Sequence, residues 1–220
     1  MKIEKYYELS WYDIAINKLK ELVPDGKGKV VYDIGAGNNI LKERVEQHGA
    51  EWIGFDYIPR QDFIHKWNIE TESIDRTDSP DVIFFLEVIE HLHNPGFAIK
   101  HISEAAKKGT HIIITTPNPF WSINRIKFFI LGFFPNFTEE DMNNNHHVFT
   151  VWPYVLEKLL KENGFKIKDT YTLMCKASFP KFTINPIFFV KIAYYLVRKF
   201  IETIDKKSIG QSYGVVAEKV

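Results

Sequence analysis

The feature of this sequence that most limits its fold is a regular alternation between short apolar runs and longer segments with helical spacing. The apolar runs are rich in β-branched and aromatic residues, which is typical of buried strands. The strand candidates are "KVVYDI" (29–34), "EWIGFD" (51–56), "DVIFFLE" (81–87), "THIIITTP" (110–117), "KIKDTYTL" (166–173) and "GVVAEK" (214–219). The helix candidates are "NNILKERVEQHG" (38–49), "PGFAIKHISEAAKKG" (95–109) and "YVLEKLLKENGF" (154–165). This alternation predicts an α/β fold with a mostly parallel sheet that carries helices on both faces.

Two segments break the alternation, and each is too long for an ordinary connection. Residues 118–147 lie between a strand and a helix, whereas residues 179–207 lie between the last two strands and are dense in aromatic and lysine residues. We expect both to be helical insertions that are placed where they cover a site. A chain of 220 residues can bury one full core, so we expect a single domain over residues 1–220.

The composition argues against several functional classes. Basic and acidic residues both number 28, so the net charge is zero and no basic field favours nucleic acid as a partner. The single cysteine, Cys175, excludes an internal disulfide framework and a cysteine-rich zinc site. The N-terminal residues lack the apolar region of a signal peptide, and no run reaches the roughly 18 apolar residues of a membrane span. We therefore expect a cytoplasmic protein.

The segment "VVYDIGAGNN", residues 30–39, predicts a binding loop at the end of a buried strand. A strand that runs into D-x-G-x-G and then a helix leaves backbone N–H groups open to a ligand at the strand's end. Asp56 closes the next strand, nineteen residues after Gly37, where a carboxylate can accept hydrogen bonds from ribose hydroxyls. The pattern therefore favours an adenosine-bearing ligand.

Two features of this loop argue against a nicotinamide dinucleotide. Ile40 stands where the dinucleotide fingerprint has its third glycine, and Asp33 places a negative charge at the mouth of the loop. That charge suits an ammonium or sulfonium group better than a pyrophosphate. The expected ligand is cationic and lacks phosphate. The alternative is that Asp33 and the glycines only form a tight turn between strand and helix.

The sequence resembles the class I S-adenosylmethionine-dependent methyltransferases, and among them the ubiquinone-pathway (type 11 and type 12) group, in six ordered segments. These are "VVYDIGAGNN", "WIGFDYIP", "HKWNIE", "DVIFFLEVIEHLHNP", "HIIITTPN" and "VWPYVLEKLLKENGFKI", and "SYGVVAEK" is similar to the family's last strand. The resemblance covers roughly residues 28–118 and 146–173. It implies a Rossmann-like, doubly wound sheet of seven strands, S-adenosylmethionine as the cofactor, and methyl transfer to a small-molecule acceptor.

The same resemblance implies a set of cofactor contacts. They are Asp33, Gly35, Ala36, Gly37, Asp56, Tyr57, Asn68, Leu86 and Glu87. By this resemblance Asp33 and the glycines bound the methionine end of the cofactor, Asp56 holds the ribose, and Asn68 lies beside the adenine. Asn39 departs from the pattern, since many members have a third glycine there. From the residues alone, Asp56 also suits a solvated strand end and Asn68 an ordinary turn.

Methyl transfer requires little chemistry from the protein beyond holding the acceptor close to the methyl group. For a hydroxyl acceptor, His91 is the candidate general base, because its ordinary pKa lies near neutrality. The alternative is that His91 only packs in its turn. Some relatives use an E-x-x-E-H set with a later histidine to bind a divalent ion, so a metal site is a second hypothesis for Glu87, Glu90 and His91 with His146 or His147. The helical spacing of the first three supports it only if "EVIEHL" begins a helix.

The two inserted segments bear on the acceptor and the partners. Both carry bulky apolar side chains interleaved with lysine and arginine, a pattern that suits a lid over a hydrophobic or lipid-linked acceptor or contact with an anionic membrane surface. Packing against the domain or a second subunit, as in a homodimer, is the alternative. Two other functions remain open at this point. They are a nicotinamide-dependent oxidoreductase and a non-catalytic relative that binds a membrane or a partner.

Overall fold

The computed structural model describes residues 4–7, 9–74, 78–133, 138–174, 179–181, 183 and 185–220, and Cys175 lies outside these ranges. The strands are β1 (Glu4–Tyr7), β2 (Val30–Ile34), β3 (Glu51–Asp56), β4 (His65–Lys66), β5 (Val82–Leu86), β6 (His111–Pro117), β7 (Phe165–Met174) and β8 (Ser212–Lys219). The α-helices are α1 (Trp11–Leu22), α2 (Lys42–Gln47), α3 (Pro95–Ala105), α4 (Ser122–Leu131), α5 (Glu139–Asn145), α6 (Pro153–Glu162) and α7 (Ile187–Ile204). Two 3-10 turns, η1 (Ile89–His91) and η2 (Lys206–Ser208), complete the described elements.

The strands form one sheet in the order β1-β7-β8-β6-β5-β2-β3-β4. All neighbouring pairs are parallel except those of β8, which runs antiparallel to both β6 and β7. The predicted α/β, mostly parallel fold is confirmed. The sheet has eight strands, one more than expected, because residues 4–7 add β1 at the edge beside β7.

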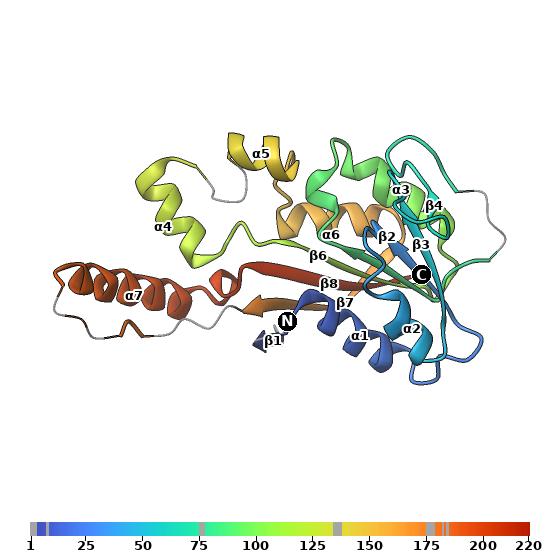
Figure 1. Cartoon of the computed structure of the whole chain (residues 1–220), viewed down its shortest axis with the longest axis horizontal. Coiled ribbons are helices and arrows are strands. Elements are labelled where there is room, and N and C mark those ends of the chain that lie inside the picture. Colours follow the sequence, from blue (N-terminus) through green and yellow to red (C-terminus); the bar gives the residue numbers. More distant parts are fainter. Residues whose placement is uncertain are drawn as a thin grey trace.

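Helices cover both faces of this sheet (Figure 1), with α1 and α2 on one side and α3 and α6 on the other. The central strand β5 shows why its sequence is apolar throughout. Val82 and Phe84 pack in the core on the side of α1, and Ile83 and Phe85 pack in the core on the side of α3. A strand that is buried on both faces needs a continuous apolar run rather than an alternating one.

Helix α1 was not anticipated from the sequence. It begins at a capping box, in which the Ser10 hydroxyl accepts a hydrogen bond from the Asp13 N–H at 3.1 Å. The Asp13 carboxylate accepts one in return from the Ser10 N–H at 3.0 Å. The signal was present as "SWYD" ahead of an apolar periodicity, and it is the standard mark of a helix N-terminus.

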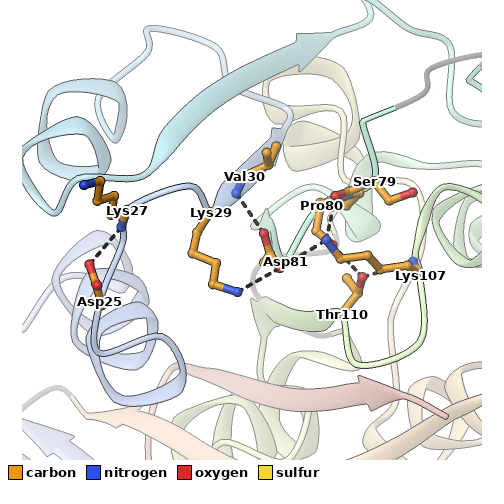
Figure 2. Close-up of polar contacts among 9 residues, drawn as sticks. All are labelled: Asp25, Lys27, Lys29, Val30, Ser79, Pro80, Asp81, Lys107 and Thr110. Atoms are coloured by element: carbon orange, nitrogen blue, oxygen red, sulfur yellow. Dashed lines mark hydrogen bonds and ion pairs between the residues drawn. The ribbon is translucent and has the colours of Figure 1, made fainter.

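The carboxylate of Asp81 connects the segments at the amino ends of the central strands β2 and β5 (Figure 2). Asp81 accepts a hydrogen bond from the Val30 N–H at 3.0 Å and pairs with Lys107 at 3.1 Å and Lys29 at 3.5 Å. Its contacts therefore join the start of β2 to the loop between α3 and β6. The residues proposed for function follow the opposite, carboxyl ends of these strands, as expected in parallel sheets.

The two predicted insertions are helical in the described residues. The first contains α4 and α5, and the second contains α7, and all three project from the sheet layer in Figure 1. A polar network joins α4 to α7. The Glu202 carboxylate accepts hydrogen bonds from Ser122 Oγ at 2.9 Å and from Arg198 Nε at 2.6 Å, and Arg125 pairs with Asp205 at 2.5 Å. Among the described helices, none combines the length and apolar character required to cross a bilayer.

Candidate functional site

The loop after β2 adopts the backbone that its glycines predict. Gly35 and Gly37 have φ angles of +80° and +51°, and Asn39 has a φ of +53°. Asparagine tolerates this left-handed region better than most residues, which explains its presence where relatives have glycine. At Gly35 a second constraint applies, since a Cβ there would lie 2.4 Å from Val88 Cγ2. Only glycine fits at that position without displacing the loop after β5.

The N–H groups of Gly35, Ala36 and Gly37 are already hydrogen-bonded within the protein, contrary to the expectation from the motif that they are open to a ligand. The N–H groups of Gly35 and Ala36 both donate to the Phe55 carbonyl, at 2.8 and 2.9 Å, and the Gly37 N–H donates to Asp56 Oδ2 at 2.9 Å. Helix α2 begins only at Lys42, so its N-terminus is farther from the glycines than predicted. The loop is therefore organised by its hydrogen bonds to β3.

Asp33 lies at the carboxyl end of β2 and is 5% exposed. It accepts a hydrogen bond from Trp52 Nε1 at 3.1 Å. Burial raises the pKa of Asp33 to about 7, and the charge of Asp56 acts in the same direction against the opposing Trp52 hydrogen bond. With Gly35, Ala36, Gly37 and Leu86, Asp33 lines a cavity of about 160 Å³. A buried carboxyl in this state favours a cationic neighbour that stabilises its ionised form.

A larger cavity of about 530 Å³ lies next to the first and shares Gly35 with it. It brings together predicted residues from three segments, which are Asp56 and Tyr57 at the end of β3, Asn68 after β4, and Glu87 with His91 after β5. Asp56 closes β3, and its second oxygen accepts from the Ile58 N–H at 2.9 Å. Asn68 also forms a turn, since its Oδ1 accepts from the Glu70 N–H at 3.2 Å. The turn interpretation of Asn68 and its place on the cavity wall are therefore compatible.

Two glutamates follow β5, Glu87 partly buried and Glu90 buried. Glu87 has a φ of +53°, and desolvation of its carboxyl group raises its pKa to about 7. Glu90 is 1% exposed, and burial together with the charge of Glu87 raises its pKa well above the usual range. Thr116 Oγ1 donates to Glu90 Oε2 at 2.9 Å, whereas Glu90 Oε1 is buried with no hydrogen-bond partner among the described residues.

His91 lies in η1 rather than in an α-helix, so the predicted helical spacing of Glu87, Glu90 and His91 does not occur. The segment 146–149 brings these groups together instead. The Glu90 carbonyl accepts from the N–H groups of Val148 and Phe149, each at 3.0 Å, and this pairing places His147 against His91 with ring centroids 4.9 Å apart. Ligand atoms of Glu90, His91 and His147 lie within 4.8 Å of one another, and Glu87 is outside this group.

The protonation of His91 follows from its contacts. Its Nδ1 lies 3.1 Å from the His146 carbonyl, which can only accept, so the proton resides on Nδ1 and Nε2 carries the lone pair. Burial lowers the pKa of His91, and His147 adds to this effect while the His146 carbonyl opposes it. The imidazole is therefore neutral near pH 7, with Nε2 able to accept a proton or bind a cation.

Two further hollows lie beyond β6. One of about 240 Å³ is lined by residues of β7, β8 and the start of α6, and the other, of about 660 Å³, lies against α4. Phe120 lines both. The larger hollow is almost entirely apolar and is lined by Pro119, Phe120, Arg125, Phe128, Phe129 and Trp152. The first insertion therefore forms part of the wall of a hollow, and its role as a cover over the site stays a prediction.

Some lining residues escaped the sequence analysis. Tyr12 of α1 reaches the cavity that holds Asp33, and the capping box that marks α1 was the signal that could have identified it. Trp67, Glu70 and His93 line the larger cavity. Trp67 and Glu70 flank Asn68 in sequence, so the same turn presents them. No pattern pointed to His93.

The sequence matches the family described as "Methyltransferase domain" over residues 9–170. Curated relatives include the ubiquinone biosynthesis O-methyltransferases of Nitrosomonas europaea, 24% identical over 54% of this chain and 63% of that protein, and of Acinetobacter baylyi, 24% identical over 71% of each. The chain spans about half to seven tenths of the length of the curated relatives that it matches.

Solved structures share the fold. They include a SAM-dependent methyltransferase from Archaeoglobus fulgidus, with a TM-score of 0.61, 21% identity and 94% of each chain covered. The magnesium protoporphyrin IX methyltransferase of Synechocystis PCC 6803, solved with bound SAH, gives a TM-score of 0.60 at 16% identity over 95% of this chain and 82% of that one. The chain therefore belongs to the methyltransferase domain family and shares the class I fold of these SAM-dependent enzymes.

Proposed function

We propose that this protein transfers the methyl group of S-adenosylmethionine to an oxygen atom of a small, hydrophobic acceptor. The observation that carries the proposal is the wall of the cavity of about 530 Å³, where Asp56, Asn68, Glu87 and His91 meet from three separate segments of the chain. Such convergence of polar groups in one concave site at the carboxyl ends of parallel strands is the usual setting of a cofactor.

The cofactor fits the residues present. We assign its cationic methionine end to the cavity beside Asp33, its ribose to the Asp56 carboxylate, and its adenine to the wall formed by Tyr57 and Asn68. Leu86 and Glu87 close the other side. The buried Asp33 supports this orientation, because a carboxyl with a pKa of about 7 gains most from a neighbouring cation. When bound, the cofactor would supply a methyl carbon that is activated by its bond to a sulfonium sulfur. After transfer of the methyl group to the acceptor oxygen, the sulfur would remain as a neutral thioether.

The chain's own contribution is to orient the acceptor and remove its proton. His91 can accept this proton at Nε2, because the hydrogen bond to the His146 carbonyl keeps its own proton on Nδ1. As the oxygen–carbon bond forms, the acceptor's hydroxyl proton passes to Nε2, and the resulting imidazolium later releases it to water. A positioned base of this kind typically contributes about 10²–10⁴ in rate.

A divalent cation is a second candidate for this role, and the residues fit it. Glu90, His91 and His147 offer one carboxylate and two imidazoles within 4.8 Å of one another, and Glu90 Oε1 is buried without a hydrogen-bond partner in the described part of the chain. This mixed nitrogen and oxygen set suits a manganese-like ion better than magnesium. Such an ion supplies Lewis acidity to an acceptor hydroxyl. His91 Nε2 would then be a ligand, and dependence of turnover on a chelator distinguishes the two roles.

The hydrophobic character of the acceptor rests on the hollow of about 660 Å³ beside α4. Its lining is aromatic and aliphatic except for Arg125. The curated relatives are named ubiquinone biosynthesis O-methyltransferases, which supports an oxygen atom and an apolar acceptor class. We place the acceptor's apolar part against α4, with its hydroxyl directed toward His91.

Calorimetric titration tests the proposal at its base. S-adenosylmethionine and S-adenosylhomocysteine are expected to bind in the micromolar range, with no binding of NAD. Preference for NAD would overturn the proposal in favour of an oxidoreductase. Absence of binding by all three would indicate a non-catalytic relative. With cofactor binding established, a screen of phenols and other apolar hydroxyl compounds, with and without Mn²⁺ or a chelator, identifies the acceptor and the role of the metal.

A further inference from the structure

Helices α4 and α7 have an inverted distribution of polar and apolar side chains. The residues that they bury against each other and the domain are largely polar, since Ser122 and Asn124 are 0% exposed, Glu202 is 6% exposed and Arg198 is 9% exposed. Most of their exposed side chains are apolar. The most exposed are Phe129 (91%), Phe189 (73%), Ile204 (70%), Ile130 (69%), Val190 (68%) and Phe200 (66%). A helix that faces water shows the opposite arrangement.

The exposed apolar side chains lie on two helices that are joined to each other at one end of the molecule. Both helices extend from the same end of the molecule, away from α3 and the edge strand β4 (Figure 1). The buried Glu202 network holds them together, through Ser122 Oγ at 2.9 Å and Arg198 Nε at 2.6 Å. We call the outward surfaces of α4 and α7 the projecting face. Large contiguous apolar surfaces of this kind on a protein mark an interaction site.

The exposed charged residues of α4 and α7, Lys127 and Lys191, are basic, whereas Arg125 pairs with Asp205 at the end of α7. The two helices contain five basic residues and one acidic residue, and that residue, Glu202, is buried in the network with Arg198 and Lys199. Lys127 and Lys191 are exposed, and neither pairs with an acidic group among the described residues. The chain as a whole has no net charge, so this excess is local. The acidic residues of α5 belong to a separate helix, which stands above α4 in Figure 1 whereas α7 lies below it.

We propose that the projecting face docks on an anionic lipid bilayer, with its aromatic and aliphatic side chains in the interfacial layer and Lys127 and Lys191 at the level of the headgroups. Apolar burial combined with attraction of lysine to anionic lipid is the physical basis of helix binding in the membrane interface. A second copy of the chain is the less favoured occupant, because two identical basic faces would repel each other. The inference is independent of the proposed acceptor. If that proposal also holds, docking brings the hollow lined by Phe128 and Phe129 against the source of a lipid-linked acceptor.

Vesicle co-sedimentation tests the docking directly. The full chain is mixed with vesicles of phosphatidylcholine alone or with about 30 mol% phosphatidylglycerol, at low salt and at about 1 M salt, where the Debye length falls to about 3 Å. Binding is expected to be much stronger on the anionic vesicles at low salt. At high salt the anionic and neutral vesicles are expected to bind alike. No sedimentation with either vesicle, or equal sedimentation with both at low salt, would overturn the inference.

Two variants separate the apolar and charged contributions. Phe129→Ser with Phe189→Ser is expected to lower the partition coefficient at least tenfold on anionic vesicles, since both side chains lie outside the core. Lys127→Gln with Lys191→Gln is expected to lower the partition coefficient by roughly 25-fold on anionic vesicles only, at about fivefold per lysine. Circular dichroism and thermal unfolding confirm that each variant is folded, and the lysine variant tests the inference even where the phenylalanine variant fails to fold.

Matched controls come from α3, at the other end of the molecule. Phe97 is 49% exposed and Lys100 is exposed, so Phe97→Ser with Lys100→Gln removes the same side-chain types from a face that is not proposed to dock. This control is expected to bind vesicles as the unaltered chain does. Equal losses in the control and in the variants of α4 and α7 would refute the placement. A dimer in light scattering that the phenylalanine substitutions dissociate, without vesicle binding, would assign the face to a second copy instead.

Discussion

Replacement of Asp33 by asparagine is expected to change the stability of the protein and its affinity for the cofactor in opposite directions. Asp33 is 5% exposed, and burial raises its pKa from 3.8 to about 7. The native state therefore holds a proton that the unfolded chain releases near pH 4. The contribution of Asp33 to the free energy of unfolding is therefore fully present below the pKa of the unfolded chain. It decreases as the pH rises from there to about 7, and it stays low at higher pH.

The magnitude follows from the shift of about three pKa units. At about 1.4 kcal/mol per pKa unit, the free energy of unfolding of the unaltered protein at pH 8 is lower by on the order of 4 kcal/mol than that of a chain whose residue 33 stays neutral. Asparagine cannot ionise and keeps an oxygen that can accept the Trp52 hydrogen bond. Asp33→Asn is therefore expected to stabilise the unliganded protein at pH 8 and to leave its stability near pH 4 almost unchanged. Denaturant unfolding at the two pH values measures both.

Binding of the cationic cofactor reverses this effect, because a neighbouring positive charge favours the carboxylate. At pH 6 a group with a pKa of about 7 is protonated roughly nine times in ten, so cofactor binding is expected to release about 0.9 proton and to be about tenfold weaker than at pH 8. Calorimetry in buffers of different ionisation enthalpy counts the protons. Asp33→Asn is expected to bind weakly with little dependence on pH. Equal proton release by both proteins at pH 6 would refute the assignment of Asp33 to the cationic end.

Three further predictions concern single residues of the site. Gly35→Ala is expected to destabilise the protein by about 1–3 kcal/mol in thermal unfolding, because of its φ of +80° and the clash with Val88. Gly109→Ala is the control, since Gly109 has a φ of +87° with open space around it, and only the backbone penalty of about 1 kcal/mol is expected there. Equal losses of stability in the two variants would refute the steric argument. Asp56→Ala is expected to weaken cofactor binding by about 1.5–3 kcal/mol in calorimetric titration, and an unchanged affinity would exclude Asp56 from the site. His91→Ala is expected to reduce turnover by about 10²–10⁴ with little change in cofactor affinity, and undiminished turnover on an identified acceptor would leave His91 a structural role.

The local features of the fold were predictable because they arise from short-range patterns. Each strand predicted between residues 29 and 219 is present, and both long insertions contain helices. The helix α1 was missed although its capping residues were visible, because its apolar positions are interrupted by charges. Strand β1 carries no signal of its own. Its four residues pair with β7, far away in the chain, and such pairing is a property of the folded sheet.

In the candidate site, too, the features that depend on local sequence were predictable, and those that depend on contacts between distant segments were not. The positions of Asp33 and Asp56 at strand ends followed from the alternation of strands and helices. The use of the loop N–H groups by Phe55 and Asp56 did not, because it depends on the register between β2 and β3. The meeting of His91 with His147 depends on how the chain returns after α5 to pair with the Glu90 carbonyl. The raised pKa values depend on burial, which is a property of the whole fold.

The contact between Gly35 and Val88 sets a spacing inside the site. The loop after β2 and the loop after β5 touch there through one methyl group, so close that even a Cβ would not fit between them. The first loop lies beside the cofactor's methionine end in the proposed arrangement, and the second leads directly into η1 and His91. Val88 therefore sets the spacing between the loop after β2 and the segment that leads to His91. In the proposed arrangement, a smaller side chain at this position is expected to let the two loops approach each other and a larger one to hold them farther apart, while His91 and the proposed cofactor contacts keep their chemical identity.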